Sequence, residues 1–146
     1  MMNPELQLLH PYPFEKLAAL KAGATPPASL TDIMLSIGEP KHQPPQFVLD
    51  TLVNNLDKLS NYPTTKGIPE LRKAIAQWLD NRFKLNGRIN FDQHILPVNG
   101  TREALFAFAQ AIVDRNKKNP LVISPNPFYQ IYEGAAILSG AQPYFL

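Results

Sequence analysis

Residues 98–106, which read VNGTREALF, place a glycine, a hydroxyl group and an arginine at the start of an expected helix. Gly100 lets the backbone approach a ligand closely, and the free amides of the helix start together with the Thr101 hydroxyl can donate to phosphate oxygens. Arg102 faces the positive end of the helix dipole, which is unfavourable unless an anion lies there. These three residues therefore form a candidate phosphate-binding turn. The alternative is that Asn99 or Thr101 simply caps the helix, and a Gly-Thr pair alone favours this simpler role.

A second candidate lies in the loop after the next expected strand, where the sequence reads SPNPFYQIY. Tyr129 follows the carboxyl end of that strand, and a flat aromatic side chain there can stack on a heteroaromatic ring. Ordinary packing is the alternative for any aromatic residue taken singly. Ligands of parallel sheets bind in the crevice at the carboxyl ends of the strands, so we expect this loop and the Gly100 turn to meet there.

Other common chemistries find no motif in this chain. It contains neither a P-loop nor Gly-x-Gly-x-x-Gly, so the usual nucleotide cradles are absent. No serine lies in a Gly-x-Ser-x-Gly context, and hydrolase chemistry therefore lacks support. The three histidines, His10, His42 and His94, have no ligand spacing among themselves, so we expect no metal site.

The elements that would position these residues alternate from residue 94 onward. Short apolar runs at 94–98, 121–125 and 142–146 are typical of strands. Helical patterns at 101–114 and 128–140 separate them. This alternation predicts an α/β fold in which the three strands lie in one parallel sheet with helices packed on it. Parallel sheets are normally covered on both faces, so three strands suggest the front part of a larger protein.

Before residue 94 the chain is mostly helical and is punctuated by prolines. Helices are predicted over 13–23, 45–60 and 69–87, and a proline begins each of them. The run IMLSIG at 33–38 predicts a short strand that ends in a tight turn. Trp78 lies on the apolar face of the third helix, so we expect it in the core.

Composition and charge set wider bounds. Of the 146 residues, 45% are apolar and 18% are charged, which is the balance of a globular protein without a membrane span. The net charge is only +2 and the basic residues are scattered, so no nucleic-acid partner is expected. The chain has no cysteine and begins without a signal-peptide pattern, which favours the cytoplasm.

Four blocks of the sequence resemble the class I/II aminotransferases, fold type I enzymes that use pyridoxal phosphate. The blocks are LSIGEP, YPTTKGIPELRKAIAQWL, VNGTREALFAF and SPNPFYQIYEGAA, in the family's order. With PYPFEKL, they look most like the bacterial subgroup that acts on N-succinyldiaminopimelate in lysine biosynthesis. The resemblance implies an N-terminal arm and small-domain segment over residues 1–45. Residues 46–146 would form the start of the helix-flanked, parallel-sheet large domain that binds pyridoxal phosphate.

The resemblance assigns four cofactor-binding residues to the two loops described above. Gly100, Thr101 and Arg102 correspond to the turn that holds the cofactor phosphate, and Tyr129 corresponds to the aromatic residue that stacks on the pyridine ring. The residues themselves point to the same turn and to the same tyrosine.

Two further assignments come from the resemblance alone. Tyr62 corresponds to the tyrosine that reaches the cofactor phosphate of a neighbouring subunit, so it should point away from its own Gly100 turn. Gly38 corresponds to the glycine whose backbone contacts the substrate carboxylate. The implied partners are a second subunit in a homodimer and small amino-acid and 2-oxo-acid substrates.

Parts of the family's machinery are absent from this chain. None of its lysines has the setting of the lysine that forms the Schiff base, which lies farther along in the family than this chain extends. The aspartate that pairs with the pyridine nitrogen and the arginine that grips the substrate carboxylate are also missing. The chain thus carries half a cofactor site and no catalytic residue, and alone it should be inactive.

Three interpretations remain open. The first is the N-terminal part of an aminotransferase with N-succinyldiaminopimelate and 2-oxoglutarate as its substrate pair. The second is another pyridoxal-phosphate enzyme, either a carbon–sulfur lyase or a different aminotransferase. The third is a non-catalytic protein that senses a ligand with this fold. Such regulators usually carry a DNA-binding module first, and the roughly forty residues before the KHQPP loop are too few and too broken by proline for one.

Overall fold

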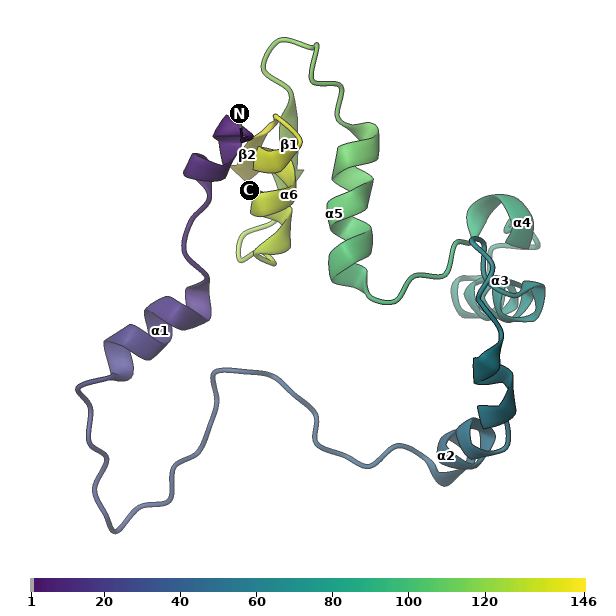
Figure 1. Cartoon of the computed structure of the whole chain (residues 1–146), viewed down its shortest axis with the longest axis horizontal. Coiled ribbons are helices and arrows are strands. Elements are labelled where there is room, and N and C mark those ends of the chain that lie inside the picture. Colours follow the sequence, from purple (N-terminus) through teal and green to yellow (C-terminus); the bar gives the residue numbers. More distant parts are fainter. Residues whose placement is uncertain (1) are drawn as a thin grey trace. The chain divides into compact units, whose positions relative to one another are not determined.

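The computed structural model describes residues 2–146 (Figure 1). The polypeptide divides into two compact units. One unit joins the residues up to Thr25 with Val98–Leu146, and the other spans Pro26–Pro97. No helix of residues 2–146 is long and apolar enough to cross a membrane.

A two-stranded parallel sheet forms the base of the first unit. Strand β1 (Leu121–Ser124) pairs with strand β2 (Gln142–Phe145), and Leu121 lies opposite Gln142 in the register. Helix α6 (Ile131–Leu138) connects the strands, as a crossover between parallel strands requires. This arrangement confirms the predicted α/β class.

The core of this unit lies where α6 meets the sheet and a second helix. Helix α5 (Thr101–Ile112) packs against α6, which in turn packs against both strands (Figure 1). The buried side chains of α6 are Ala135, Ala136 and Ile137. Small side chains allow close approach of neighbouring elements. The Gln110 side-chain amide also donates to the Ala135 carbonyl at 3.3 Å and ties α5 to α6.

The N-terminal segment adds two short helices, a 3₁₀ helix η1 (Pro4–Leu8) and α1 (Pro13–Lys21). Helix η1 contacts α6, and His10 lies 3.1 Å from the Glu133 carboxylate of α6. Helix α1 begins with a proline at its first position, which agrees with the predicted start.

Arg115 closes the carboxyl end of α6. Its guanidinium donates to the Leu138 carbonyl at 3.0 Å and to the Ser139 carbonyl at 3.1 Å. The same guanidinium lies 3.7 Å from the Glu5 carboxylate of η1. A cation at a helix C-terminus satisfies carbonyls that have no partner within the helix and interacts favourably with the helix dipole.

The second unit is helical. It contains α2 (Gln46–Val53), the 3₁₀ helix η2 (Leu56–Ser60), α3 (Pro69–Phe83) and the short helix α4 (Phe91–His94). Helix α3 packs against α4.

Helix α3 ends at Phe83, before the predicted end at Gly87, and left-handed residues form the turn that follows. Lys84 adopts a left-handed conformation with φ of 55°, and Gly87 follows with φ of 72°. The Gly87 amide donates to the Asp80 carboxylate at 2.7 Å, which stabilises the turn after the helix.

Two predicted strands are absent, and the three-strand prediction was therefore wrong. His94 is the last residue of α4, and residues 95–98 form no ladder, although Ile95 is extended. Residues 33–38 likewise contain no strand. A strand requires a neighbour for its hydrogen bonds, and in the described part of the chain neither run is paired.

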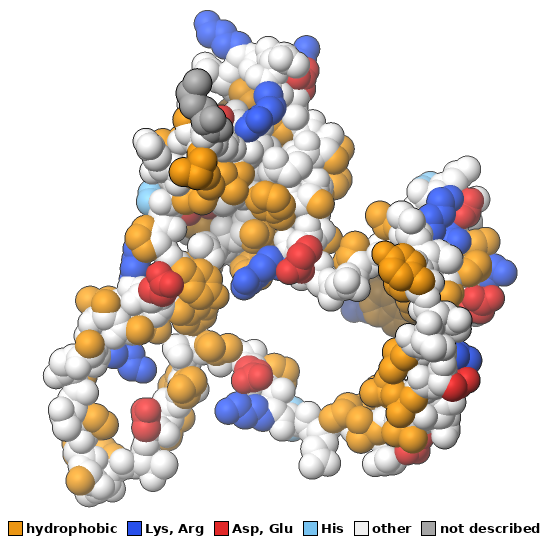
Figure 2. Space-filling model, viewed as in Figure 1, with side chains coloured by type: hydrophobic (Ala, Val, Ile, Leu, Met, Phe, Trp, Pro, Cys, Tyr) orange, Lys and Arg blue, Asp and Glu red, His pale blue; other side chains and the backbone are white. Residues whose placement is uncertain are grey.

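Two further expectations were also wrong in detail. The helix predicted over 45–60 breaks at Asn54 and Asn55, because the Asn55 side chain donates to the Thr51 carbonyl and competes with backbone pairing. Trp78 is 59% exposed rather than buried, since the covered face of α3 carries Arg72 and Ala76. Large apolar side chains are also exposed along α2 (Figure 2).

Replacing Arg115 by methionine should destabilise the first unit. The stem of the side chain remains, but two carbonyls at the end of α6 lose their charged donor, which should lower the free energy of unfolding by about 1 kcal/mol. Urea denaturation followed by circular dichroism measures the change. The control is Lys117→Met, which removes a charge from the same turn, and an equal loss in both variants would contradict the capping role.

Candidate functional site

The predicted phosphate turn lies at the amino end of α5. Gly100 is the N-cap, with φ of −173° and ψ of 154°, which is extended backbone. The first backbone bond of the helix runs from the Ala104 amide to the Gly100 carbonyl at 3.3 Å. The amides of Thr101, Arg102 and Glu103 therefore occupy the open end of the helix, where they can donate to an anion.

The backbone of Gly100 is unstrained, and a side chain at this position would meet Glu103. A Cβ atom at this position would lie 2.8 Å from the Glu103 carboxylate oxygen Oε2. Glu103 is exposed, so its flexible side chain can turn aside. In the structure this carboxylate lies next to the helix start, where negative charge interacts favourably with the helix dipole.

The structure brings Arg102 and Tyr129 together. The Arg102 Nε donates to the Tyr129 hydroxyl at 3.0 Å, which connects the start of α5 to the loop after β1. The Tyr129 ring also meets the Tyr132 ring edge to face, with centroids 5.8 Å apart. The sequence predicts only that these two loops meet at the carboxyl ends of the strands. In the structure a direct hydrogen bond joins them.

Tyr12 is a neighbour of Arg102 that the sequence analysis missed. Hydrogen bonding to the Tyr129 hydroxyl, and next to the Tyr12 hydroxyl, raises the pKa of Arg102. Tyr12 directly precedes α1 and packs on Phe14, with ring centroids 5.4 Å apart. In the sequence Tyr12 is distinguished only by the proline on either side of it, and its spacing from Arg102 predicts no contact.

The remaining predicted residues belong to the unit Pro26–Pro97. Tyr62 lies between η2 and α3 and is 96% exposed. Gly38 is exposed in a segment without regular structure, and a Cβ there would meet nothing within 4 Å. Their roles toward phosphate and substrate stay predictions.

Comparison with known proteins identifies the family. The model for aminotransferase class I and II matches residues 31–146, which is most of the chain. The chain belongs to this family. Its members depend on pyridoxal phosphate.

Individual relatives agree with this assignment. The chain is 31% identical to an LL-diaminopimelate aminotransferase of Dehalococcoides mccartyi over 99% of its own length and 36% of that protein. It resembles an aminotransferase crystal structure from Neisseria meningitidis with a TM-score of 0.89 and 45% identity, covering 99% of this chain and 36% of that one. Aminotransferase AspB from Helicobacter pylori gives a TM-score of 0.83 and 36% identity, covering 94% and 35%. The chain thus spans about 36% of the length of the first relatives it matches.

The residues at the start of α5 fit the phosphate group of the cofactor. The donors there are the Thr101 hydroxyl, three helix-start amides and the Arg102 guanidinium, which is the donor set that phosphate oxygens accept from. Tyr129 is 41% exposed, so part of its ring is available to an aromatic ligand. Among the residues described, Glu103 brings an opposing charge to this turn, and its exposed side chain would have to rotate away.

Replacing Tyr129 by phenylalanine should release the Arg102 guanidinium. The Nε–H of Arg102 would lose its acceptor, and its exchange with solvent should rise about threefold because one hydrogen bond is lost. Proton–nitrogen NMR of the arginine Nε–H groups measures the change. Tyr144→Phe, a variant of the exposed tyrosine in β2, is the matched control, and unaltered exchange in Tyr129→Phe would show that the bond is not populated in solution.

Proposed function

We propose that this chain supplies the phosphate-binding part of a pyridoxal-phosphate-dependent aminotransferase. The hydrogen bond between Arg102 and Tyr129 carries the proposal, because it joins the phosphate donors to the ring that would cover the pyridine. Gly100 and Thr101 complete the phosphate turn. The membership of the chain in the aminotransferase family supports the same assignment.

The remaining roles follow the family pattern. Tyr62 would donate to the cofactor phosphate of a neighbouring subunit in a homodimer, and Gly38 would offer its backbone to the substrate carboxylate. The high exposure of Tyr62 is compatible with contact to another subunit. We further propose that residues 1–45 form the arm and small-domain segment, that 46–146 begin the large domain, and that the protein acts in the cytoplasm.

The site residues of this chain bind and orient the cofactor rather than take part in a chemical step. Pyridoxal phosphate, when bound, supplies an electron sink that stabilises negative charge on the substrate α-carbon. Arg102 and the helix-start amides fix the phosphate end, and Tyr129 restricts the tilt of the ring. Such fixation aligns the reacting bond with the ring system and lowers the entropic cost of reaction.

For the substrate we propose N-succinyldiaminopimelate with 2-oxoglutarate, a pair used in lysine biosynthesis. The blocks that resemble this subgroup support the proposal. The Dehalococcoides mccartyi relatives are named LL-diaminopimelate aminotransferases, which supports a substrate with the diaminopimelate skeleton.

Replacing Arg102 by alanine should weaken binding of the cofactor phosphate. We expect the dissociation constant of the chain for pyridoxal phosphate to rise about tenfold, since a charge-assisted hydrogen bond to phosphate is lost. Equilibrium dialysis against pyridoxal phosphate and against pyridoxal, which lacks the phosphate, measures the effect. Arg88→Ala is the matched control, and equal affinity of wild type and Arg102→Ala would remove Arg102 from the site.

Substrate choice is tested in a protein that joins this chain to the Schiff-base lysine of the family. Its kcat/KM should be about tenfold or more higher with N-succinyldiaminopimelate than with LL-diaminopimelate. A site built for the succinyl carboxylate leaves its own polar groups unpaired when that group is missing. A preference for LL-diaminopimelate would instead place the protein with the relatives that carry this name.

A further inference from the structure

The second unit contains a buried arginine whose charge needs a partner. Arg72 of α3 has a side chain that is only 7% exposed, and it donates to the Asp92 carboxylate at 2.7 Å. Its guanidinium carbon also lies 5.5 Å from the centre of the Phe91 ring. The Arg72 Nε has no hydrogen-bond partner among the described residues. The Asp92 carboxylate is therefore the main partner that offsets the buried positive charge of the guanidinium.

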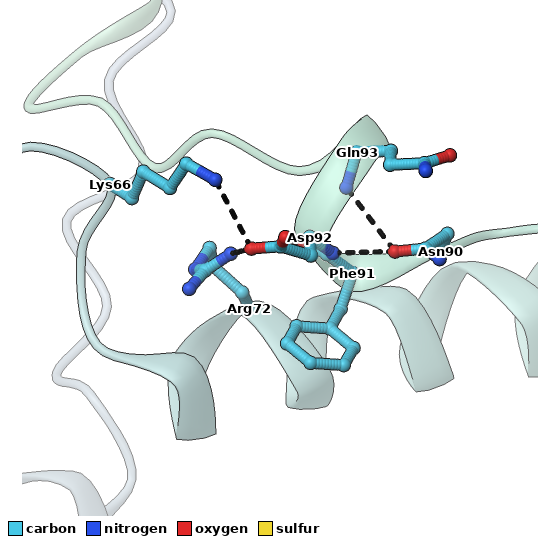
Figure 3. Close-up of polar contacts among 6 residues, drawn as sticks. All are labelled: Lys66, Arg72, Asn90, Phe91, Asp92 and Gln93. Carbon is cyan, nitrogen blue, oxygen red and sulfur yellow. Dashed lines mark hydrogen bonds and ion pairs between the residues drawn. The ribbon is translucent and has the colours of Figure 1, made fainter.

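The helix start of α4 fixes the direction of Asp92. The Asn90 side-chain oxygen accepts from the Asp92 amide at 2.8 Å and from the Gln93 amide at 3.2 Å (Figure 3). The Asn90 backbone N–H donates in turn to the His94 Nδ1 at 3.0 Å. This cap holds the backbone of Asp92, while the hydrogen bond from Arg72 holds its carboxylate toward α3.

The same carboxylate oxygen holds a loop. Lys66 donates to the Asp92 Oδ1 at 3.3 Å, and Figure 3 shows Lys66 and Arg72 converging on this atom from two different segments. Lys66 belongs to the loop that precedes α3, the residues 62–67 that read YPTTKG. One oxygen thus connects the loop to both α3 and α4.

A second contact holds the end of this loop. Gly67 has φ of 73°, and a Cβ at this position would lie 3.0 Å from Pro97 Cγ. Its amide donates to the Thr64 carbonyl at 3.0 Å. The carboxyl half of the loop is therefore fixed, whereas Tyr62 at its start is 96% exposed and has little packing of its own to orient it.

We propose that Asp92 and Lys66 are positioning residues that hold the 62–67 loop in the conformation that presents Tyr62. The proposal rests on the proposed function insofar as Tyr62 serves the phosphate of a neighbouring subunit. Because the Tyr62 side chain makes little contact with its own chain, its direction depends on the loop backbone. The loop backbone in turn depends on the contact between Lys66 and the Asp92 carboxylate. Arg72 and Asn90 hold Asp92 in place.

The charge network sets a pH window for this arrangement. Hydrogen bonds from Arg72 first, and from Lys66 next, lower the pKa of Asp92 below its ordinary value of 3.8. A lowered pKa means that the contribution of the carboxylate is complete above that ordinary value and is lost as the pH falls through the folded-state pKa. The cations that face this group are Lys66 and Arg72, while Lys73 lies over the Phe91 ring beside it.

The experiment compares loop variants in the full chain by amide hydrogen exchange at Gly67, corrected for the intrinsic rate at each pH. Lys66→Met removes the loop contact but leaves the Arg72–Asp92 pair in place, so the fold is retained. Exchange at Gly67 should rise about fivefold in Lys66→Met and by at least as much in Asp92→Asn. Lys66→Arg can still reach the carboxylate and should restore the wild-type rate.

The matched control is Asp57→Asn, a change of an aspartate in η2 that should leave Gly67 exchange unaltered. Lowering the pH below 3.8 should accelerate exchange in wild type, whereas Asp92→Asn should show no such step. Wild-type exchange in both Lys66→Met and Asp92→Asn would overturn the proposal. A pH step retained in Asp92→Asn would assign the effect to another group and would also overturn it.

Dialysis with pyridoxal phosphate separates this inference from the proposed function. Faster Gly67 exchange together with weaker binding of pyridoxal phosphate in Lys66→Met supports both the positioning role and the proposed function. Faster exchange with unchanged binding would overturn the positioning role toward the cofactor while leaving the proposed function standing. Absence of binding by wild type would count against the proposed function, and Gly67 exchange alone would then decide whether the loop is held.

Discussion

Helix α6 lies against a helix and a sheet at once, and two of its three buried side chains are alanines. Ala135 and Ala136 are buried there, and larger residues would push α5 away from the strands. This close packing places the start of α5 next to the loop after β1. The hydrogen bond between Arg102 and Tyr129 joins these two neighbouring segments.

The second unit depends on charge rather than on apolar burial. Its large side chains, such as Phe47 and Trp78, remain exposed, while Arg72 is buried. A buried guanidinium is tolerated only with a carboxylate close by, and removing such a partner is more costly than losing an exposed ion pair. The arrangement of α3, α4 and the preceding loop thus follows from one charge that must be compensated.

Much of the fold could be predicted because local signals and tertiary contacts agree. Helices α1 and α3 begin at prolines, and the strands β1 and β2 are short apolar runs on either side of a helical crossover. The predicted strands at 33–38 and 94–98 failed because apolar character gives no information about whether a neighbouring strand is present. The prediction that Trp78 is buried failed for a similar reason, since no element among the residues described covers its side of α3.

The candidate site was predictable in its parts but not in its connections. The Gly100 turn and Tyr129 follow from residue types at the ends of strands, whereas the contact of Tyr12 with Arg102 joins distant segments without any motif. Asp92 was missed for the same reason, because a single aspartate in a short helix carries no chemical pattern. The importance of such residues lies in the segments they join.

Glu103 places a carboxylate close to the predicted phosphate turn. Its carboxylate lies beside the Gly100 backbone, where an incoming anion would also have to sit. A bound anion would lie close to this carboxylate, so the Glu103 side chain would have to turn away to avoid repulsion. Negative charge is favoured at the amino end of a helix, so a dianionic phosphate would gain more from this position than a single carboxylate does.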